Sequence, residues 1–157
     1  MPSADAVTES ILIRRAPAEV FAVVADPAGD PRWSAAVVEA RRTSPGPLGS
    51  GSRFEQTLAL LGRRLRISGV VTEYEPGRRI AIGPAEEYAG PLRFSAGSRT
   101  VEPVEDGSRV TFRADGRSGL FGGRVEPLVR WAVRRAFRRG LRDLKRVLET
   151  GAPAPGG

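Results

Sequence analysis

Residues 125–149, VEPLVRWAVRRAFRRGLRDLKRVLE, carry the pattern of one long amphipathic helix. Apolar residues recur at spacings of three and four, so one broad helical face collects them and the arginines occupy the other. Gly140 falls near the middle of the apolar face, although glycine inside a helix costs about 1 kcal/mol relative to alanine. A tight contact between helix and sheet explains this position; a bound ligand or a bulky neighbour near the backbone are the alternatives. The apolar face comprises Val125, Val129, Val133, Ala136, Phe137, Leu144 and Val147.

The other face of this helix carries nearly all of the net charge. The chain has 25 basic and 18 acidic residues, a net charge of +7, and residues 120–149 hold nine of the basic residues but only three of the acidic ones. A basic helix can attract nucleic acid, anionic lipid or an acidic partner, yet a solvated outer face is the ordinary interpretation. Anion binding is therefore expected to be weak, with no specific nucleic-acid partner. Trp131 falls on this basic side, where it either covers nearby loops or is exposed. The basic side chains expected to be exposed are Arg134, Arg135, Arg138, Arg142 and Lys145.

Upstream of the helix, the pattern predicts one strand, two short helices and a run of further strands. Residues 7–13 alternate between apolar and polar side chains, as in a half-buried strand. A helix follows from Ala16-Pro17, because proline suits the first helical turn, and Asp26-Pro27 ends it. A short turn or helix runs through Pro31 to Trp33. Tight turns at 61–63 and 105–107 indicate antiparallel hairpins. The further strands are expected near Val37–Thr43, Ser52–Leu61, Arg63–Tyr74, Arg79–Ile82, Leu92–Glu102 and Ser108–Ala114.

Length and composition exclude several classes of protein. The 157 residues suit a single domain, placed here at 1–150, with a disordered tail at 151–157. Cysteine and histidine are absent, which excludes disulfides, thiolate chemistry, histidine metal sites and serine triads of the usual kind. No metal and no cofactor are expected, because neither a glycine-rich phosphate loop nor calcium-loop spacing occurs. The longest purely apolar run, Val20–Ala25, is far shorter than the ~20 residues of a membrane helix. No transmembrane segment or signal peptide is expected, and the expected location is cytoplasmic.

The order of elements resembles the START-like, or SRPBCC, superfamily, and within it the bacterial polyketide cyclase/dehydrase and lipid-transport group. Four stretches carry the resemblance: residues 16–21, APAEVF; residues 26–33, with Asp26, Pro31 and Trp33; residues 71–76, VTEYEP; and residues 107–112, GSRVTF. The resemblance implies an α+β helix-grip fold, in which a curved antiparallel sheet of about seven strands wraps around the C-terminal helix and leaves a ligand cavity. It does not imply one reaction, because aromatase/cyclases, carriers of hydrophobic metabolites and chaperone cofactors share the fold.

Alternation along each strand predicts which side chains line that cavity. In residues 92–102 an inward Val101 brings Arg99 inward with it, although Phe94 has the opposite parity and a bulge would be needed to reconcile them. Tyr88 is predicted in a loop at the cavity mouth, with an ordinary surface position as the alternative. Trp33 is predicted at the wall near the entrance, with ordinary packing of the short helix as the alternative. The predicted ligand-binding residues are Trp33, Phe54, Gln56, Leu58, Ile67, Val71, Tyr88, Val110, Phe112, Val129, Val133 and Phe137.

Three polar side chains, Gln56, Glu73 and Arg99, are predicted to face inward. A buried glutamate and arginine should pair, since unpaired buried charges are costly. Such a pair could hold a ligand carbonyl through Arg99 and accept a proton at Glu73, as a cyclisation requires. The alternatives are a structural ion pair, or an alternation that is miscounted by one residue so that both side chains are exposed.

The preferred interpretation is a protein that binds a small hydrophobic ligand resembling a polyketide, lipid or terpenoid. The alternatives are a cyclase or dehydratase that uses neither metal nor histidine, and an interaction module built on the arginine-rich helix. The protein is expected to be a monomer or a homodimer.

Overall fold

A computed structural model describes residues 6–85, 96–115 and 126–151. Within these ranges the chain forms seven strands, one short α-helix, one 3₁₀ helix and a long C-terminal α-helix. In chain order these are β1 (Val7–Ile13), α1 (Pro17–Val24), η1 (Pro27–Arg32), β2 (Val37–Arg42), β3 (Arg53–Leu60), β4 (Arg63–Glu75), β5 (Arg79–Pro84), β6 (Ala96–Val104), β7 (Gly107–Asp115) and α2 (Glu126–Thr150). The predicted elements are thereby confirmed, and the predictions for Tyr88, Phe94 and the tail beyond residue 151 lie outside the described residues.

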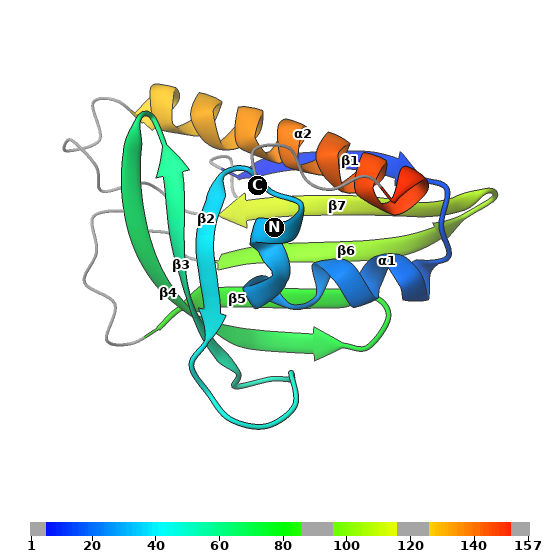
Figure 1. The fold of residues 1–157 in the computed structure, drawn as a ribbon, viewed down its shortest axis with the longest axis horizontal. Helices are drawn as coiled ribbons and strands as arrows, with labels where there is room; N and C mark the ends of the chain where they lie inside the picture. The colour runs from blue at the N-terminus through cyan, green and yellow to red at the C-terminus, as the bar shows by residue number, and fades with distance from the viewer. Residues whose placement is uncertain (1–5, 86–95, 116–125, 152–157) are drawn as a thin grey trace.

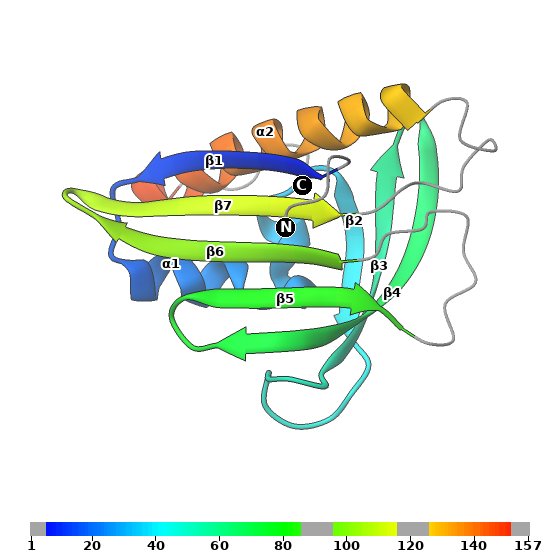
Figure 2. The same ribbon diagram turned by 180° about the vertical axis from the view of Figure 1, so that it is seen from behind.

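The seven strands form one antiparallel sheet in the order β1-β7-β6-β5-β4-β3-β2. Figures 1 and 2 show that the sheet curls into a half-barrel. The helices α1 and α2 and the 3₁₀ helix η1 lie on its inner, concave side, while Figure 2 looks onto the outer side of the strands. This is the expected helix-grip arrangement.

Two tight turns illustrate how local sequence fixes the sheet. Leu61 and Gly62 join β3 to β4, and both have positive φ, 52° and 73°, as a two-residue hairpin turn with right-handed strand twist requires. Gly107 follows the turn between β6 and β7 with a φ of 153°. A Cβ atom there would lie 2.1 Å from the carbonyl oxygen of Ile13, so only glycine fits where this hairpin passes β1.

The largest hydrophobic cluster lies between the short helices, α2 and three strands of the sheet. It joins side chains of β1, α1, β6, β7 and the second half of α2, and Trp33 contributes the largest ring. Val20, Phe21 and Val24 of α1 are all buried and lie on one face of the helix, whereas Ala22 on the opposite face is exposed. The buried cluster consists of Ile13, Val20, Phe21, Val24, Ala25, Trp33, Val101, Val110, Phe112, Leu141 and Leu144.

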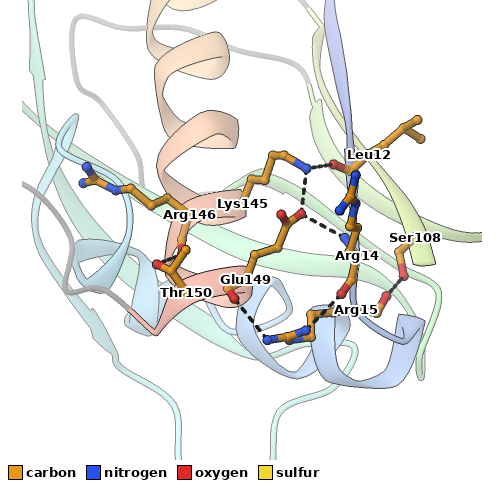
Figure 3. A network of polar contacts seen from close by, with 8 residues as sticks. All are labelled: Leu12, Arg14, Arg15, Ser108, Lys145, Arg146, Glu149 and Thr150. Carbon is orange, nitrogen blue, oxygen red and sulfur yellow. Dashed lines mark hydrogen bonds and ion pairs between the residues drawn. The ribbon is translucent and has the colours of Figure 1, made fainter. Parts of the chain in front are cut away.

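Polar contacts fasten the C-terminal end of α2 to the end of β1 and the start of α1 (Figure 3). Lys145 Nζ donates to the Leu12 carbonyl at 2.8 Å and to Glu149 Oε2 at 2.6 Å. The same Glu149 oxygen accepts the backbone N–H of Arg14 at 2.9 Å. Arg15 donates to the Glu149 carbonyl at 3.2 Å, and its own carbonyl accepts the Ser108 hydroxyl at 2.7 Å. One carboxylate thus joins the last turn of α2 to the first strand.

These contacts also decide how the basic face of α2 meets solvent. Lys145 is only partly exposed, because it reaches across to the end of β1. The four arginines predicted to be exposed on this face, Arg134, Arg135, Arg138 and Arg142, are exposed.

Candidate functional site

The concave side of the sheet holds a buried ion pair between Arg99 of β6 and Asp30 of η1. Arg99 Nη1 donates to Asp30 Oδ1 at 2.7 Å, and Arg99 Nη2 donates to Asp30 Oδ2. A second bond from Nη1 reaches the Val24 carbonyl at 2.9 Å, at the end of α1. The Asp30 side chain is fully buried and that of Arg99 is 16% exposed. The bidentate pair therefore fixes both short helical segments to the middle of the sheet.

Gln56 completes this cluster from β3. Its amide donates to Asp30 Oδ2 and to the Pro27 carbonyl, both at 2.8 Å, and the residue is buried. The Arg99 guanidinium carbon lies 5.6 Å from the centre of the Trp33 ring and 5.4 Å from that of Phe112. These are cation–π distances, and the aromatic rings exclude water from the ion pair. The inward orientations predicted for Gln56 and Arg99 are present in the structure.

Glu73 does not face inward, and the predicted pairing of Glu73 with Arg99 is wrong. Its carboxylate points to solvent, with 59% of the side chain exposed, and accepts a hydrogen bond of 3.0 Å from Arg79 Nε. The cause is a shift in register between β4 and β5, between Val71 and Glu73. Such a bulge adds one residue to a strand and reverses the alternation beyond it. Asp30 occupies the place that the sequence reasoning gave to Glu73.

The predicted apolar lining divides into two groups. Trp33, Val110 and Phe112 are buried in the core, and Phe137 packs on it with its ring edge toward Phe112 at 5.8 Å. Phe54, Ile67, Val71 and Val129 are buried outside that cluster, whereas Leu58 and Val133 are partly exposed. The Phe54 ring crosses directly over Gly69 of β4, where a Cβ atom would come within 2.5 Å of it. Tyr88 lies outside the described residues.

An apolar groove of about 320 Å³ lies between the N-terminal half of α2 and the facing part of the sheet. Its walls are mostly alanine, leucine and glycine, with the indole of Trp131 and two arginines. Gly140 belongs to the groove, and a Cβ atom there would stand 3.4 Å from Trp33 Cζ3. The neighbour of Gly140 is therefore the bulky Trp33 and not a strand, as the alternative interpretation had it, and a side chain at this position would make only ordinary van der Waals contact with it. The lining consists of Ala35, Ala36, Ala59, Leu60, Leu61, Trp131, Ala132, Arg135, Ala136, Arg139 and Gly140.

The sequence reasoning missed both Asp30 and the groove. Asp30 lies in a proline-rich 3₁₀ segment that the sequence marked only as a turn or short helix, so no periodicity indicated where its side chain points. The groove depends on small residues, which read as ordinary helix and strand positions. None of the predicted ligand-binding residues that the structure describes lines this groove. The alternation along a strand predicts which side chains lie on the inner face of the sheet. It does not predict where along that face the helix leaves a groove.

The cluster around Arg99 has limited chemical capacity. Three of its five N–H bonds are used by Asp30 and Val24, which leaves two donors for a ligand carbonyl. The nearby carboxylate, Asp30, accepts from both Arg99 and Gln56 and is shielded from solvent. Among the described residues no group of acidic side chains could hold a metal ion. The arrangement can orient a polar group, but it offers no free general base beside Arg99.

No helix within the described part of the chain has the length and apolar character needed to cross a membrane.

Solved structures with a similar fold come from several bacteria. The Zhui aromatase/cyclase from Streptomyces sp. R1128 has a TM-score of 0.75 at 14% identity, covering 94% of this chain and 97% of that one. TTHA0849 from Thermus thermophilus has a TM-score of 0.75 at 20% identity, with 94% and 99% covered. DR_A0006 from Deinococcus radiodurans has a TM-score of 0.68 at 18% identity, with 94% and 98% covered.

At these identities the structural similarity concerns the fold alone. No curated protein matches the chain significantly. The sequence profile of the family described as polyketide cyclase / dehydrase and lipid transport, however, matches residues 4–149, almost the whole chain. The chain therefore belongs to the polyketide cyclase / dehydrase and lipid transport family.

Proposed function

We propose that this protein binds a small hydrophobic ligand, of polyketide, lipid or terpenoid type, between α2 and the concave side of the sheet. The observation that carries the proposal is the apolar groove beneath the N-terminal half of α2. Its volume of about 320 Å³ lies in the range of small-molecule sites, and its alanine and glycine walls leave room where larger side chains would fill it. Family membership supports the same class of ligand.

The partial exposure of side chains on the inner face of the sheet supports this location. Phe54 and Gln56 of β3 are buried, but Leu58 and Leu60, which follow on the same face, are partly exposed. The inner face therefore becomes more accessible toward the groove. A ligand there would cover apolar surface that the fold itself leaves open to solvent, which favours binding by about 25 cal/mol per Å² covered.

Binding without chemistry accounts for the polar cluster better than catalysis does. Asp30 and Arg99 neutralise each other, and neither lines the groove, whereas Trp33 neighbours both Arg99 and Gly140 of the groove. A cyclase or dehydratase remains the alternative, because the two unused N–H donors of Arg99 could polarise a carbonyl if Trp33 moved aside.

The test is native mass spectrometry of freshly purified protein, together with displacement of a fluorescent fatty-acid probe. Ala136→Phe should narrow the groove and reduce probe affinity at least tenfold, because the added ring takes up space that a ligand chain would occupy. The matched control is Ala18→Phe, at an exposed position of α1 away from the groove. Equal affinities for Ala136→Phe and Ala18→Phe would refute the groove as the binding site. Conversion of a polyketide substrate, in place of the fatty-acid probe, that is lost in Arg99→Leu would favour the enzyme instead.

A further inference from the structure

Exposed apolar side chains gather at one end of the molecule. Of the five large hydrophobic residues that are exposed among the described ones, three belong to the N-terminal half of α2 and the turn between β3 and β4. Trp131 is 54% exposed, Leu128 49% and Leu61 37%. Leu61 and Trp131 line the same groove, and Leu128 lies three residues before Trp131, about one turn along α2. Figure 1 shows this end of α2 beside the turn that joins β3 and β4. These three residues are called the apolar tip below.

Leu61 occupies a position that its side chain disfavours. Its φ of 52° lies in the left-handed region, and it is the one described residue other than glycine with a positive φ. Asparagine or glycine is the usual choice at this hairpin position, because a bulky side chain there is strained. The chain thus accepts both backbone strain and exposure to solvent in order to hold a leucine at the end of the hairpin. Strain of this kind is concentrated at functional positions.

Arginines surround the apolar tip. Arg135 and Arg139 line the same groove as Leu61 and Trp131, and the Arg135 guanidinium lies 5.6 Å from the centre of the Trp131 ring. Arg64, which is exposed, follows the turn at the start of β4. A second groove, of about 510 Å³, runs along the β1 side of α2 and adds Arg134, Arg138 and Arg142.

Two acidic residues among the described ones form ion pairs with these arginines. Glu9 of β1 pairs with Arg138 at 2.9 Å and with Arg134 at 3.6 Å. Asp143 stands 3.9 Å from Arg139. No ion pair is found for Arg135 or Arg142 within the described part of the chain, so the face retains a surplus of positive charge.

We infer that this end of the molecule docks onto a bilayer surface that contains anionic phospholipids. The apolar tip would enter the boundary between headgroups and acyl chains, and the arginines would contact lipid phosphates, as basic interfacial helices do. An indole that carries a cation over its face suits that boundary, since one part of it is apolar and the other is hydrated. The sequence alone predicted only weak anion binding, because it placed Trp131 on the basic side of the helix but did not show that Leu61 and Leu128 lie beside it.

A nucleic acid or an acidic protein fits this surface less well. Leu61 and Leu128 would gain nothing against phosphates, and one exposed indole does not make the row of stacked rings that single strands require. An acidic protein would match the arginines, but charge alone gives no reason for a strained leucine at a hairpin turn. Leu61 and Trp131 also line the groove of the proposed ligand, but the two proposals can fail separately, because vesicle binding and binding of the fatty-acid probe are measured in different experiments.

The experiment is sedimentation with vesicles of phosphatidylcholine alone or with 30% phosphatidylglycerol, at about 0.15 M salt, near physiological screening. Trp131 provides a second signal: its emission should shift to shorter wavelength with the anionic vesicles, while buried Trp33 should not respond. Leu61→Asn and Trp131→Ala should each weaken binding about tenfold, since each removes apolar surface that would leave water. Arg135→Gln with Arg139→Gln should weaken it by a similar or larger factor. Arg109→Gln, at an exposed position of β7, is the control for the loss of a positive charge elsewhere on the surface and should have little effect.

The Leu61→Asn variant separates docking from folding. Asparagine tolerates the left-handed conformation, so this variant should unfold at the same temperature as the parent or higher while losing vesicle binding. Absence of binding to anionic vesicles would overturn the inference, as would equal binding to neutral ones. Binding to duplex DNA and to anionic vesicles that is equally insensitive to Leu61→Asn would also overturn it, and would identify a general polyanion surface.

Discussion

At the scale of single residues, the Asp30–Arg99 pair is the feature that most constrains the fold. Arg99 projects from the middle strands, and its partners belong to α1 and η1, two segments about 70 residues away in sequence. The pair therefore specifies where the short helices sit on the sheet. Burying an ion pair is worth little in net stability, but leaving one member alone is expensive.

Asp30→Asn should accordingly destabilise the protein by about 3–5 kcal/mol, because Arg99 would keep its charge in a mostly buried place without a carboxylate. Combining it with Arg99→Leu should recover part of that loss, since the uncompensated charge is then removed. Urea unfolding of the two single variants and the double variant measures this. The control is Glu73→Gln, which breaks an exposed pair and should cost no more than about 0.5–1 kcal/mol. Equal losses of unfolding free energy for Asp30→Asn and Glu73→Gln would show that breaking the buried pair costs no more than breaking an exposed one.

The contrast between Asp30 and Glu73 explains what sequence reasoning can and cannot achieve at this scale. Arg99 and Gln56 were placed correctly because each follows the alternation of a regular strand. Glu73 was misplaced because a bulge in β4 reverses that alternation, and no residue in the segment announces the bulge. Asp30 has no alternation to follow, since its 3₁₀ segment is short and contains two prolines. A regular alternation therefore predicts which side chains face one another, whereas an irregular backbone segment gives no such prediction.

At the scale of elements, the two halves of α2 have different environments. Its C-terminal half packs on the core and is fastened to β1 by Lys145 and Glu149, whereas its N-terminal half borders the open groove. Length, amphipathic character and approximate start of this helix were all predicted from its 3.6-residue period. The difference between its halves was not predicted, because both carry the same pattern of apolar and basic residues.

Glu149 gives the attachment of α2 a pH dependence. The hydrogen bond from Lys145, together with that from the Arg14 backbone, lowers the pKa of Glu149 below its ordinary value. A carboxylate with a lowered pKa in the folded state contributes stability above its unfolded pKa, about 4.3, and loses that contribution as the pH falls through the folded value. Glu149→Gln should therefore destabilise the protein near neutral pH by about 1 kcal/mol, and the difference from the parent should shrink as the pH falls below about 4.

Denaturant unfolding of the parent and of Glu149→Gln between pH 3 and pH 7 measures this difference. The matched control is Glu105→Gln, in the exposed turn between β6 and β7. A difference in unfolding free energy between the parent and Glu149→Gln that stays constant down to pH 3 would contradict the role assigned to the Glu149 carboxylate.

At the scale of the whole molecule, stability and binding are separated along the length of α2. The largest hydrophobic cluster includes Leu141 and Leu144 in the C-terminal half of α2, whereas the groove and the apolar tip lie mainly along its N-terminal half, next to Arg135, for which no ion pair is found among the described residues. Substitutions that alter the binding end therefore need not disturb the core. The same separation concentrates positive charge on one side of the protein, so electrostatic repulsion is not evenly spread.

This charge distribution predicts that salt stabilises the folded protein. The chain carries a net charge of +7, and Arg135 and Arg142 have no ion pair among the described residues, so repulsion exceeds attraction on the outer face of α2. Raising sodium chloride from about 0.01 to 0.15 M shortens the screening length from roughly 30 to 8 Å, and should raise the free energy of unfolding by roughly 0.5–1 kcal/mol. Urea unfolding at each salt concentration measures this change in the free energy of unfolding.

Arg142→Gln should be more stable than the parent at low salt, and its stability should depend less on salt. Arg41→Gln should behave oppositely, because it removes the attraction between Arg41 and Glu55, 2.9 Å apart. If the parent protein instead loses stability as salt is added, the attraction within its ion pairs outweighs the repulsion among its excess arginines, and the prediction is wrong.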